Sequence, residues 1–246
     1  NRMGAVDASI EILRDVLEHD PQNPAAHAAL EGLLAGPHQN VVADILEPVY
    51  RDLGAFDRLI RVHEVQALAA SSPDRRLELF ERIAELYEVA VDRPDLAFDA
   101  HARALVEDPS RQDVQDQLER LAVAGDKVET LAALYETRAE ALLSAGTDDG
   151  AAAGDLLARA ALYREEHLGQ IDKAIELYQR LLAREPGRVE ATDALERLFQ
   201  AGERYEELAQ VLLRKGDADL SDDDRKHALS RAGAIYEELL SQPKAA

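Results

Sequence analysis

Residues 80–109 read FERIAELYEVAVDRPDLAFDAHARALVEDP, and this stretch decides the fold. Its first half spaces large and apolar side chains three and four residues apart, as on one face of a helix. Pro94 then stands where a first helical turn tolerates a missing N–H. In the second half Ala97 is followed by His101, Ala104 and Pro109. The stretch therefore predicts two helices joined by a short turn.

The second half of this stretch occurs three times along the chain. Each copy is a small residue, a large one four later, an apolar one three after that and a proline five further on. The other copies are Ser9, Leu13, Val16, Pro21 and Ala174, Tyr178, Leu181, Pro186. The prolines lie 88 and 77 residues apart (109 − 21 and 186 − 109). Such a repeat cannot bury its apolar face alone, so neighbouring copies must stack into a solenoid.

The composition supports an all-α protein with a strongly acidic surface. Hydrophobic residues make up 46%, which is enough for a core, and Ala, Leu, Glu, Arg and Asp, most of them good helix formers, dominate. The net charge is −21, which repels nucleic acid and anionic membranes and favours basic partners. Acidity that serves only to keep a helical surface soluble is the alternative explanation. Arginine exceeds lysine 23 to 5, which suggests a GC-rich bacterium.

Cysteine is absent, so disulfides, thiol catalysis and cysteine zinc sites are excluded. No apolar run approaches the ~18 residues of a membrane span, so membrane insertion is not expected. The compartment stays open between cytoplasm and periplasm, with the cytoplasm favoured.

A second signature precedes the repeated one. Phe80-x2-Ile83-Ala84-x2-Tyr87 matches the W-x2-L-G-x2-Y pattern of the tetratricopeptide repeat (TPR), and Leu229-x2-Ala232-Gly233-x2-Tyr236 matches it again. A third copy, Leu156-x2-Arg159-Ala160-x2-Tyr163, keeps the small residue and the tyrosine but has arginine at an apolar position. Nearly the whole chain therefore resembles a TPR array, and more narrowly the long degenerate arrays of myxobacteria and their relatives. The resemblance implies a right-handed α-α superhelix of about thirteen antiparallel helices, in which a first and a second helix form each hairpin.

Three features depart from the family. The first helix that contains Tyr163 is longer than usual. Alternate units are degenerate, because Leu118-Glu119 and Leu195-Glu196 place glutamate where a small residue belongs. A helix expected at 40–53 has no counterpart in the later blocks.

We expect residues 1–246 to form one TPR-like solenoid with blocks at 1–72, 73–149 and 150–221 and a final unpaired helix at 222–241. A flexible loop is expected at 144–150, and an N-cap at Ser221. Glycines at 54, 125, 169 and 202 are expected at helix ends, in a left-handed conformation. Neither end carries an obvious polar cap, so the chain is expected to be a piece of a longer array or to dimerise through its ends.

In TPR proteins the first helices line a concave face that binds peptides or helices. Carried over by resemblance, this face would contain three sets of residues here. They are Glu78, Glu81, Glu85 and Glu88; Asp113, Asp116 and Arg120; and Glu190, Asp193 and Arg197. The first set recurs at three and four residue steps and so forms one acidic stripe. Like-charge repulsion in that stripe costs ~0.2–0.5 kcal/mol per pair, which a basic partner could relieve; a solvated helix face is the alternative.

No catalytic or cofactor motif occurs in the chain. The histidines show no H-E-x-x-H or i, i+4 pair, and His63 and His101 fall at core positions of second helices. The acidic run at 217–223 lacks the glycine and glutamate that a calcium loop needs. The glycine-rich phosphate loops and the G-x-S-x-G elbow are missing as well. We therefore expect no enzyme, no cofactor and no metal.

The sequence thus predicts a non-catalytic protein-protein interaction scaffold whose acidic groove binds a basic or amphipathic peptide or helix. Two alternatives remain: a structural spacer in a large envelope or motility assembly, and the non-catalytic arm of a multidomain regulator. The partner's identity, the superhelix curvature and the oligomeric state are left open.

Overall fold

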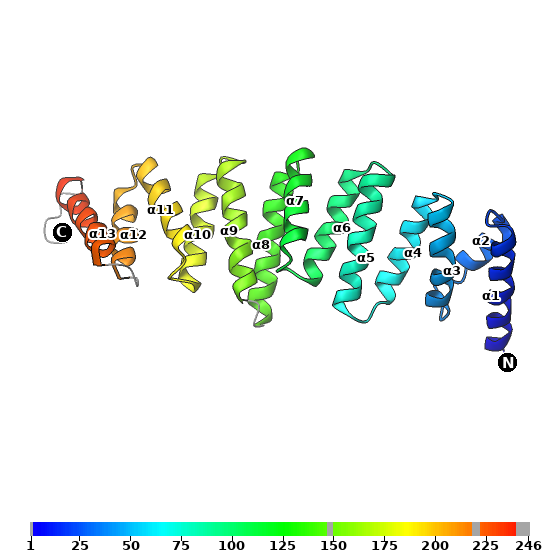
Figure 1. Cartoon of the computed structure of the whole chain (residues 1–246). Coiled ribbons are helices and arrows are strands. Elements are labelled where there is room, and N and C mark those ends of the chain that lie inside the picture. The colour runs from blue at the N-terminus through cyan, green and yellow to red at the C-terminus, as the bar shows by residue number, and fades with distance from the viewer. Residues whose placement is uncertain (1, 147–149, 218–221, 240–246) are drawn as a thin grey trace. The chain divides into compact units, whose positions relative to one another are not determined.

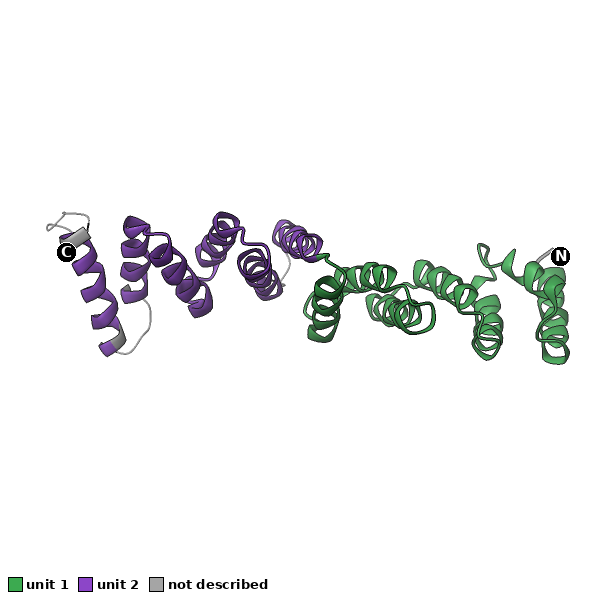
Figure 2. Cartoon of the chain, turned by 90° about the horizontal axis from the view of Figure 1, so that it is seen from above, with its two compact units in different colours: residues 1–127 green, residues 128–246 purple. Residues whose placement is uncertain are grey.

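A computed structural model describes residues 2–146, 150–217 and 222–239. These residues form thirteen α-helices and two short π-helical turns, with no strand among them (Figure 1). The prediction of an all-α chain of about thirteen helices is therefore confirmed. The helices group into two compact units, residues 1–127 and 128–246 (Figure 2). Each unit is described by itself below.

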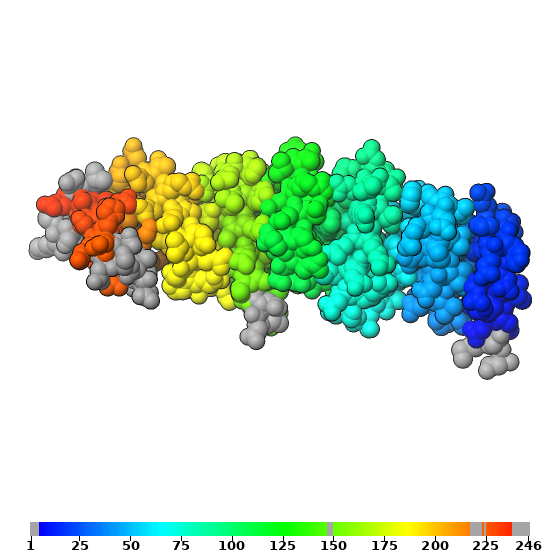
Figure 3. Space-filling view, viewed as in Figure 1, coloured from blue at the N-terminus to red at the C-terminus, as the bar shows by residue number. Residues whose placement is uncertain are grey.

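Unit 1 contains seven α-helices and one π-helix. In chain order they are α1 (Arg2–His19), α2 (Pro24–Glu31), α3 (Gln39–Asp52), α4 (Phe56–Ala69), α5 (Pro73–Glu85), η1 (Leu86–Ala90), α6 (Pro94–Glu107) and α7 (Gln112–Ala124). Successive helices pack on one another, and side chains close the gaps that the ribbons leave between them (Figure 3).

Unit 2 contains six α-helices and the second π-helix. They are α8 (Val128–Ala145), α9 (Gly150–Glu166), α10 (Ile171–Arg184), α11 (Val189–Ala201), α12 (Tyr205–Asp217), α13 (Asp222–Ala234) and η2 (Ile235–Leu239). Each helix again packs on the next one along the chain. Thr147, Asp148 and Asp149 of the expected flexible loop and Ser221 of the expected cap lie outside the described residues.

Small residues of the two signatures lie at the helix contacts, except Ser9 of the first copy of the second signature, which is exposed. Ala84, Ala160 and Ala232 of the first signature are fully buried, and so are Ala97 and Ala174 of the second. A small side chain at such a position lets two helices approach closely. Successive helical hairpins with small residues at these contacts make the fold of each unit TPR-like.

The structure reassigns the extra helix of the first block. Leu46-Glu47 on α3 matches Leu118-Glu119 on α7 and Leu195-Glu196 on α11, so α3 is itself a degenerate first helix. The expectation that the helix at 40–53 has no counterpart is wrong. The inserted element is α2, a helix of eight residues between the second helix α1 and the first helix α3. First helices are thus α3, α5, α7, α9, α11 and α13.

Left-handed residues mark the turns between helices, but two of the four predicted glycines do not adopt this conformation. Gly54 and Gly169 have φ values of 64° and 62°. Gly125 and Gly202 have φ values of −101° and −87° and act as ordinary helix caps. The residue after each of them, Asp126 or Glu203, takes the positive φ instead. The turn therefore reverses one residue later than its glycine predicts.

The two histidines predicted at core positions are buried, with His63 at 2% and His101 at 8% exposure. His63 shares a hydrogen bond of 2.9 Å with Gln66, whereas the Nδ1 of His101 has no hydrogen-bond partner. Burial lowers the pKa of both imidazoles below 6.5, because a low-dielectric site disfavours the charged ring. The prediction of packing histidines is confirmed.

These histidines make stability depend on pH. Between the lowered pKa of each histidine in the folded chain and about 6.5, the histidines bind more protons in the unfolded chain than in the folded one. The free energy of unfolding therefore falls as the pH drops through this window. The slope is up to ~1.4 kcal/mol per pH unit for each proton. We expect His101→Leu to flatten this dependence in urea titrations between pH 7 and pH 5. His101→Tyr should do the same, since Tyr178 fills the matching position on α10. Unchanged slopes in both variants would contradict a buried neutral His101.

Candidate interaction surface

The acidic stripe predicted from the sequence lies on one continuous first helix of unit 1. Glu78, Glu81 and Glu85 are on α5, and Glu88 is on η1, which continues it. Glu78 pairs with Arg75 of its own helix at 2.8 Å and keeps 57% of its side chain exposed. Glu85 is exposed, and it alone of the four forms no ion pair in the described part of the chain.

The other two glutamates of the stripe are held by the next first helix. Arg111, which caps the start of α7, lies 2.8 Å from Glu81, and Arg120 of α7 lies 2.7 Å from Glu88. Burial raises the pKa of Glu81 and outweighs the charge of Arg111. The hydrogen bond from Arg120 lowers the pKa of Glu88. The chain's own arginines therefore relieve part of the like-charge repulsion expected in the stripe.

The second predicted set lies on α7 and is close to the first. Asp113 accepts a hydrogen bond of 2.8 Å from Arg111, which lowers its pKa, and Asp116 accepts one of 2.7 Å from Gln112. Six carboxylates of α5, η1 and α7 thus share three arginines. The carboxylates are Glu78, Glu81, Glu85, Glu88, Asp113 and Asp116, and the arginines are Arg75, Arg111 and Arg120. This set, which we call the acidic surface, keeps an excess of negative charge.

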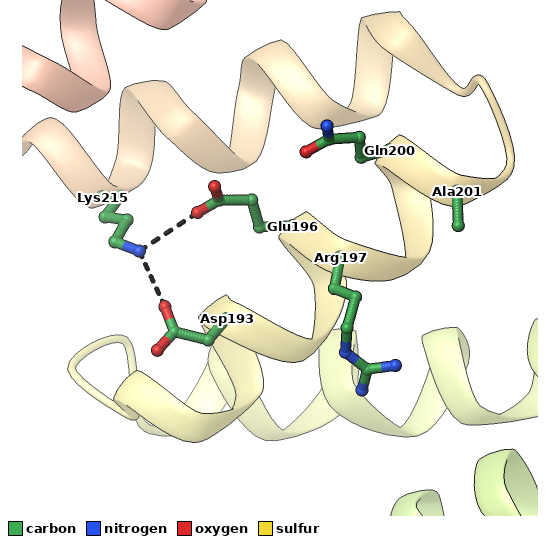
Figure 4. Close-up of a pocket in the computed structure, with 6 residues that line it drawn as sticks. All are labelled: Asp193, Glu196, Arg197, Gln200, Ala201 and Lys215. Carbon is green, nitrogen blue, oxygen red and sulfur yellow. Dashed lines mark hydrogen bonds and ion pairs between the residues drawn. The ribbon is translucent and has the colours of Figure 1, made fainter.

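The third predicted set, Glu190, Asp193 and Arg197, lies on α11 in unit 2. Asp193 and Arg197 line a cleft of about 470 Å³ together with Glu196, Gln200, Ala201 and Lys215 (Figure 4). Lys215 of α12 reaches between Asp193 at 2.7 Å and Glu196 at 3.1 Å, while Arg197 extends away from it. Arg197 pairs instead with Glu165 of α9.

Charges in this cleft are matched. Glu196 also pairs with Arg231 of α13, and Glu190 lies 3.5 Å from Arg188. Burial acts to raise the pKa of Glu196, but the hydrogen bonds from Arg231 and Lys215 outweigh it and leave that pKa lowered. Each charged residue that lines the cleft has an ionic partner, so the third set lacks the negative excess of the acidic surface.

One ion pair recurs in both units with both of its residues 77 positions apart, and two further cations recur at that spacing with carboxylates at shifted positions. Glu88–Arg120 between η1 and α7 returns as Glu165–Arg197 between α9 and α11 (165 − 88 and 197 − 120). Arg111, which holds Glu81, returns as Arg188, which pairs with Asp155. Lys127 lies 3.7 Å from Asp99, and Arg204 lies 3.4 Å from Asp172. We call these contacts the ladder, because each joins one hairpin to the next; Lys127 and Arg204 do so from the turns that follow α7 and α11.

Glutamates that look degenerate in the sequence also belong to the ladder. Glu47 of α3 lies 3.7 Å from Arg82 of α5, and Glu196 of α11 pairs with Arg231 of α13. Arg82 and Arg231 stand at matching places, two residues after Phe80 and Leu229 of the first signature. The glutamate that replaces a small residue is thus an anchor for the arginine of the next first helix.

Sequence reasoning missed most residues of the ladder, among them Glu47, Arg111, Glu165 and Arg188. The signal was available, since Arg111 and Arg188, like Glu88 and Glu165, are 77 residues apart, as are two of the prolines. The sequence repeat described above consists of apolar and small residues, whereas the ion pairs of the ladder consist of charged residues that repeat at the same spacing.

The residues that the structure describes contain no group of three or more His, Cys, Asp or Glu that could hold a metal ion. None of their helices is long and apolar enough to cross a membrane.

In each unit the chain is therefore an all-α array of helical hairpins, the class of fold that includes TPR proteins. Solved structures similar to it include MamA protein, with 18% identity over 76% of this chain and 98% of that one and a TM-score of 0.35. The TPR domain of P58(IPK) has 15% identity, with coverages of 94% and 66% and a TM-score of 0.35. BtubC from P. vanneervenii has 16% identity, with coverages of 96% and 90% and a TM-score of 0.34. No protein-family model and no curated protein matches the chain.

The two matching ion pairs differ in burial, and this difference predicts unequal stabilities. The side chain of Glu165 is 6% exposed and that of Glu88 is 30% exposed. Arg197→Ala would leave Glu165 buried without its partner, and its Oε2 already has none. We expect Arg197→Ala to lower the free energy of unfolding by about 3 kcal/mol and Arg120→Ala by about 0.2–1 kcal/mol. Urea denaturation measures both, and equal losses would contradict the burial argument.

Proposed function

We propose that the protein is a non-catalytic interaction scaffold whose acidic surface binds a basic or amphipathic segment of another protein. The observation that carries this proposal is the charge excess on α5, η1 and α7, where six carboxylates share three arginines. Stacked helical hairpins present extended surfaces suited to such binding. The net charge of −21 favours the encounter with a basic segment at long range.

The ladder indicates which carboxylates are available to a partner. Glu81 and Glu88 are engaged by arginines of α7, so a ligand would have to displace or share them. Glu78, Glu85 and Asp116 are exposed, and among the residues that the structure describes they hold no arginine of another helix. A lysine or arginine of the partner would bind these three with the least rearrangement. The third predicted set in unit 2 has ionic partners of its own, so it would contact a partner protein through its shape and not through an excess of charge. This set is Glu190, Asp193 and Arg197.

A structural spacer is the second candidate, and the ladder favours it. Ion pairs that recur between successive first helices fix how each hairpin sits on its neighbour within a unit. A spacer needs this regular stacking and no groove ligand. End-to-end association of the chain without affinity for a basic segment would indicate a spacer.

Capture of partners at two salt concentrations tests the scaffold. The chain is used as bait for a GC-rich bacterial lysate at about 0.1 M and about 1 M salt, between which the screening length falls from about 10 Å to about 3 Å. We expect a basic protein that is recovered at low salt and lost at high salt. In the variant Glu78→Gln/Glu85→Gln/Asp116→Asn, recovery by quantitative mass spectrometry should fall about fivefold or more.

A matched control removes the same charge elsewhere in unit 1. Asp52→Asn/Asp92→Asn/Asp126→Asn changes three exposed carboxylates, none of which forms an ion pair in the described part of the chain. Asparagine also tolerates the positive φ of Asp92 and Asp126. This control should capture as much as the parent chain. Equal loss in both variants, or recovery of nothing basic, would overturn the acidic surface and favour the spacer.

A further inference from the structure

An apolar groove lies between α1 and α3, apart from the acidic surface. Its volume is about 440 Å³, and its lining residues are Arg14, Leu17, Glu18, Val41, Asp44, Ile45, Pro48 and Val49. Leu17 is 2% exposed and forms part of the floor with the half-buried Ile45 and Val49. Val41 is 51% exposed at its edge. None of these residues belongs to the acidic surface or to the ladder.

The inserted helix α2 accounts for the opening. In the later blocks the second helix packs directly on the next first helix, as α6 does on α7 and α10 on α11. Between α1 and α3 the chain makes α2 instead, which is held in place by a 2.8 Å hydrogen bond from Tyr50 to Glu31 and by an edge contact of His27 on Tyr50. α2 touches both neighbours but contributes no residue to the groove.

In the later blocks, the position that corresponds to this groove, between a second helix and the next first helix, is occupied by another helix of the chain. The first helix α5, with η1, contacts both the second helix α6 and the next first helix α7. Its polar contacts include Arg76 to Glu107 of α6 at 2.6 Å. In unit 2, α9 contacts α10 and α11 in the same way. A first helix is thus the occupant of this place in both units, and in unit 1 it brings a cation, Arg76, to the second helix.

The negative charges at the rim of the groove also favour a helix that carries cations. Glu18 of α1 and Asp44 of α3 are exposed lining residues, and neither forms an ion pair among the residues described. The one cation of the lining, Arg14, is engaged by Glu11 of its own helix. A ligand with lysine or arginine beside an apolar face would match both the rim and the floor.

We infer that the groove between α1 and α3 is a docking site for an amphipathic helix of another protein. The apolar face of that helix covers Leu17, Ile45 and Val49, and its lysine or arginine side chains pair with Glu18 and Asp44. This site goes beyond the proposed acidic surface, because apolar burial supplies most of its affinity and charge sets the orientation of the helix.

A pair of synthetic peptides tests the docking site on the full chain. One peptide has the sequence of residues 73–91, and the other carries Glu78→Lys, Glu81→Lys and Glu85→Lys within it. Both share the apolar face of α5 and its three arginines, but the first has a net charge of −2 (3 − 5) and the second of +4 (6 − 2), so only the second is positive overall opposite the acidic rim. Fluorescence anisotropy should show saturable binding of the lysine peptide, at least tenfold tighter than that of the unmodified one.

Variants of the protein then locate the binding. Val41→Gln/Pro48→Gln removes apolar surface at two exposed positions and should weaken the lysine peptide about tenfold, with the urea midpoint unchanged or raised. The matched control Ile12→Gln changes a residue of α1 that is 63% exposed and outside the groove, and it should bind as the parent does.

Three results would overturn the inference. The first is undiminished binding to Val41→Gln/Pro48→Gln. The second is a loss only in Glu78→Gln/Glu85→Gln/Asp116→Asn, which would assign the peptide to the acidic surface and leave that proposal standing. The third is sedimentation that shows a dimer of the parent chain and a monomer of Val41→Gln/Pro48→Gln, which would make a second copy the occupant.

Discussion

Ion pairs between the first helices of successive hairpins are the interaction on which the rest of this structure depends. Apolar burial stacks the hairpins, but it is non-directional and would accept neighbouring registers at a similar free energy. An arginine opposite a carboxylate on the next helix selects one register. Because Glu88–Arg120 in unit 1 and Glu165–Arg197 in unit 2 occupy matching positions, the same register is chosen in both units.

The ladder also explains how so acidic a chain folds. Most of its pairs are partly exposed and contribute about 0–1 kcal/mol each, so their number matters more than any one of them. Glu165 and Arg164 are exceptions, because both side chains are 6% exposed and the charge of each is balanced within unit 2. Arg164 reaches both Glu129 and Glu136 of α8. Part of the excess that remains after pairing lies on α5, η1 and α7, where six carboxylates share three arginines, and the proposed function uses this part.

Much of the fold could be predicted from the sequence, because small and apolar residues carry it. Ala84, Ala97 and Ala160 were recognised by their spacing, and each is fully buried at a helix contact. The order of first and second helices followed from the same positions. Apolar spacing alone places the insertion wrongly, however, because the likeness of α3 to α7 and α11 lies in its Leu46-Glu47 pair. α2 has only eight residues, which is too short for its apolar periodicity to identify it as the inserted helix.

The candidate site was predicted less well, for a physical reason. A sequence shows which carboxylates share a helix face, but not which arginines of another helix reach them. Glu78, Glu81, Glu85 and Glu88 lie on one continuous helix, as the spacing implies, while Arg111 and Arg120 neutralise part of their charge across 30 and 32 residues of chain. The left-handed turns at Asp126 and Glu203 were missed in a similar way, since glycine beside them carried the stronger local signal.

Exchange of the two charges of one ladder pair tests this account most directly. Glu88→Arg and Arg120→Glu each place two like charges together, whereas the double exchange restores an opposite pair at the same place. Urea denaturation of the three variants and the parent gives the coupling free energy. The account predicts that each single variant loses about 1 kcal/mol and that the double variant recovers most of the combined loss. Losses that simply add would show that the ladder does not set the stacking of the hairpins.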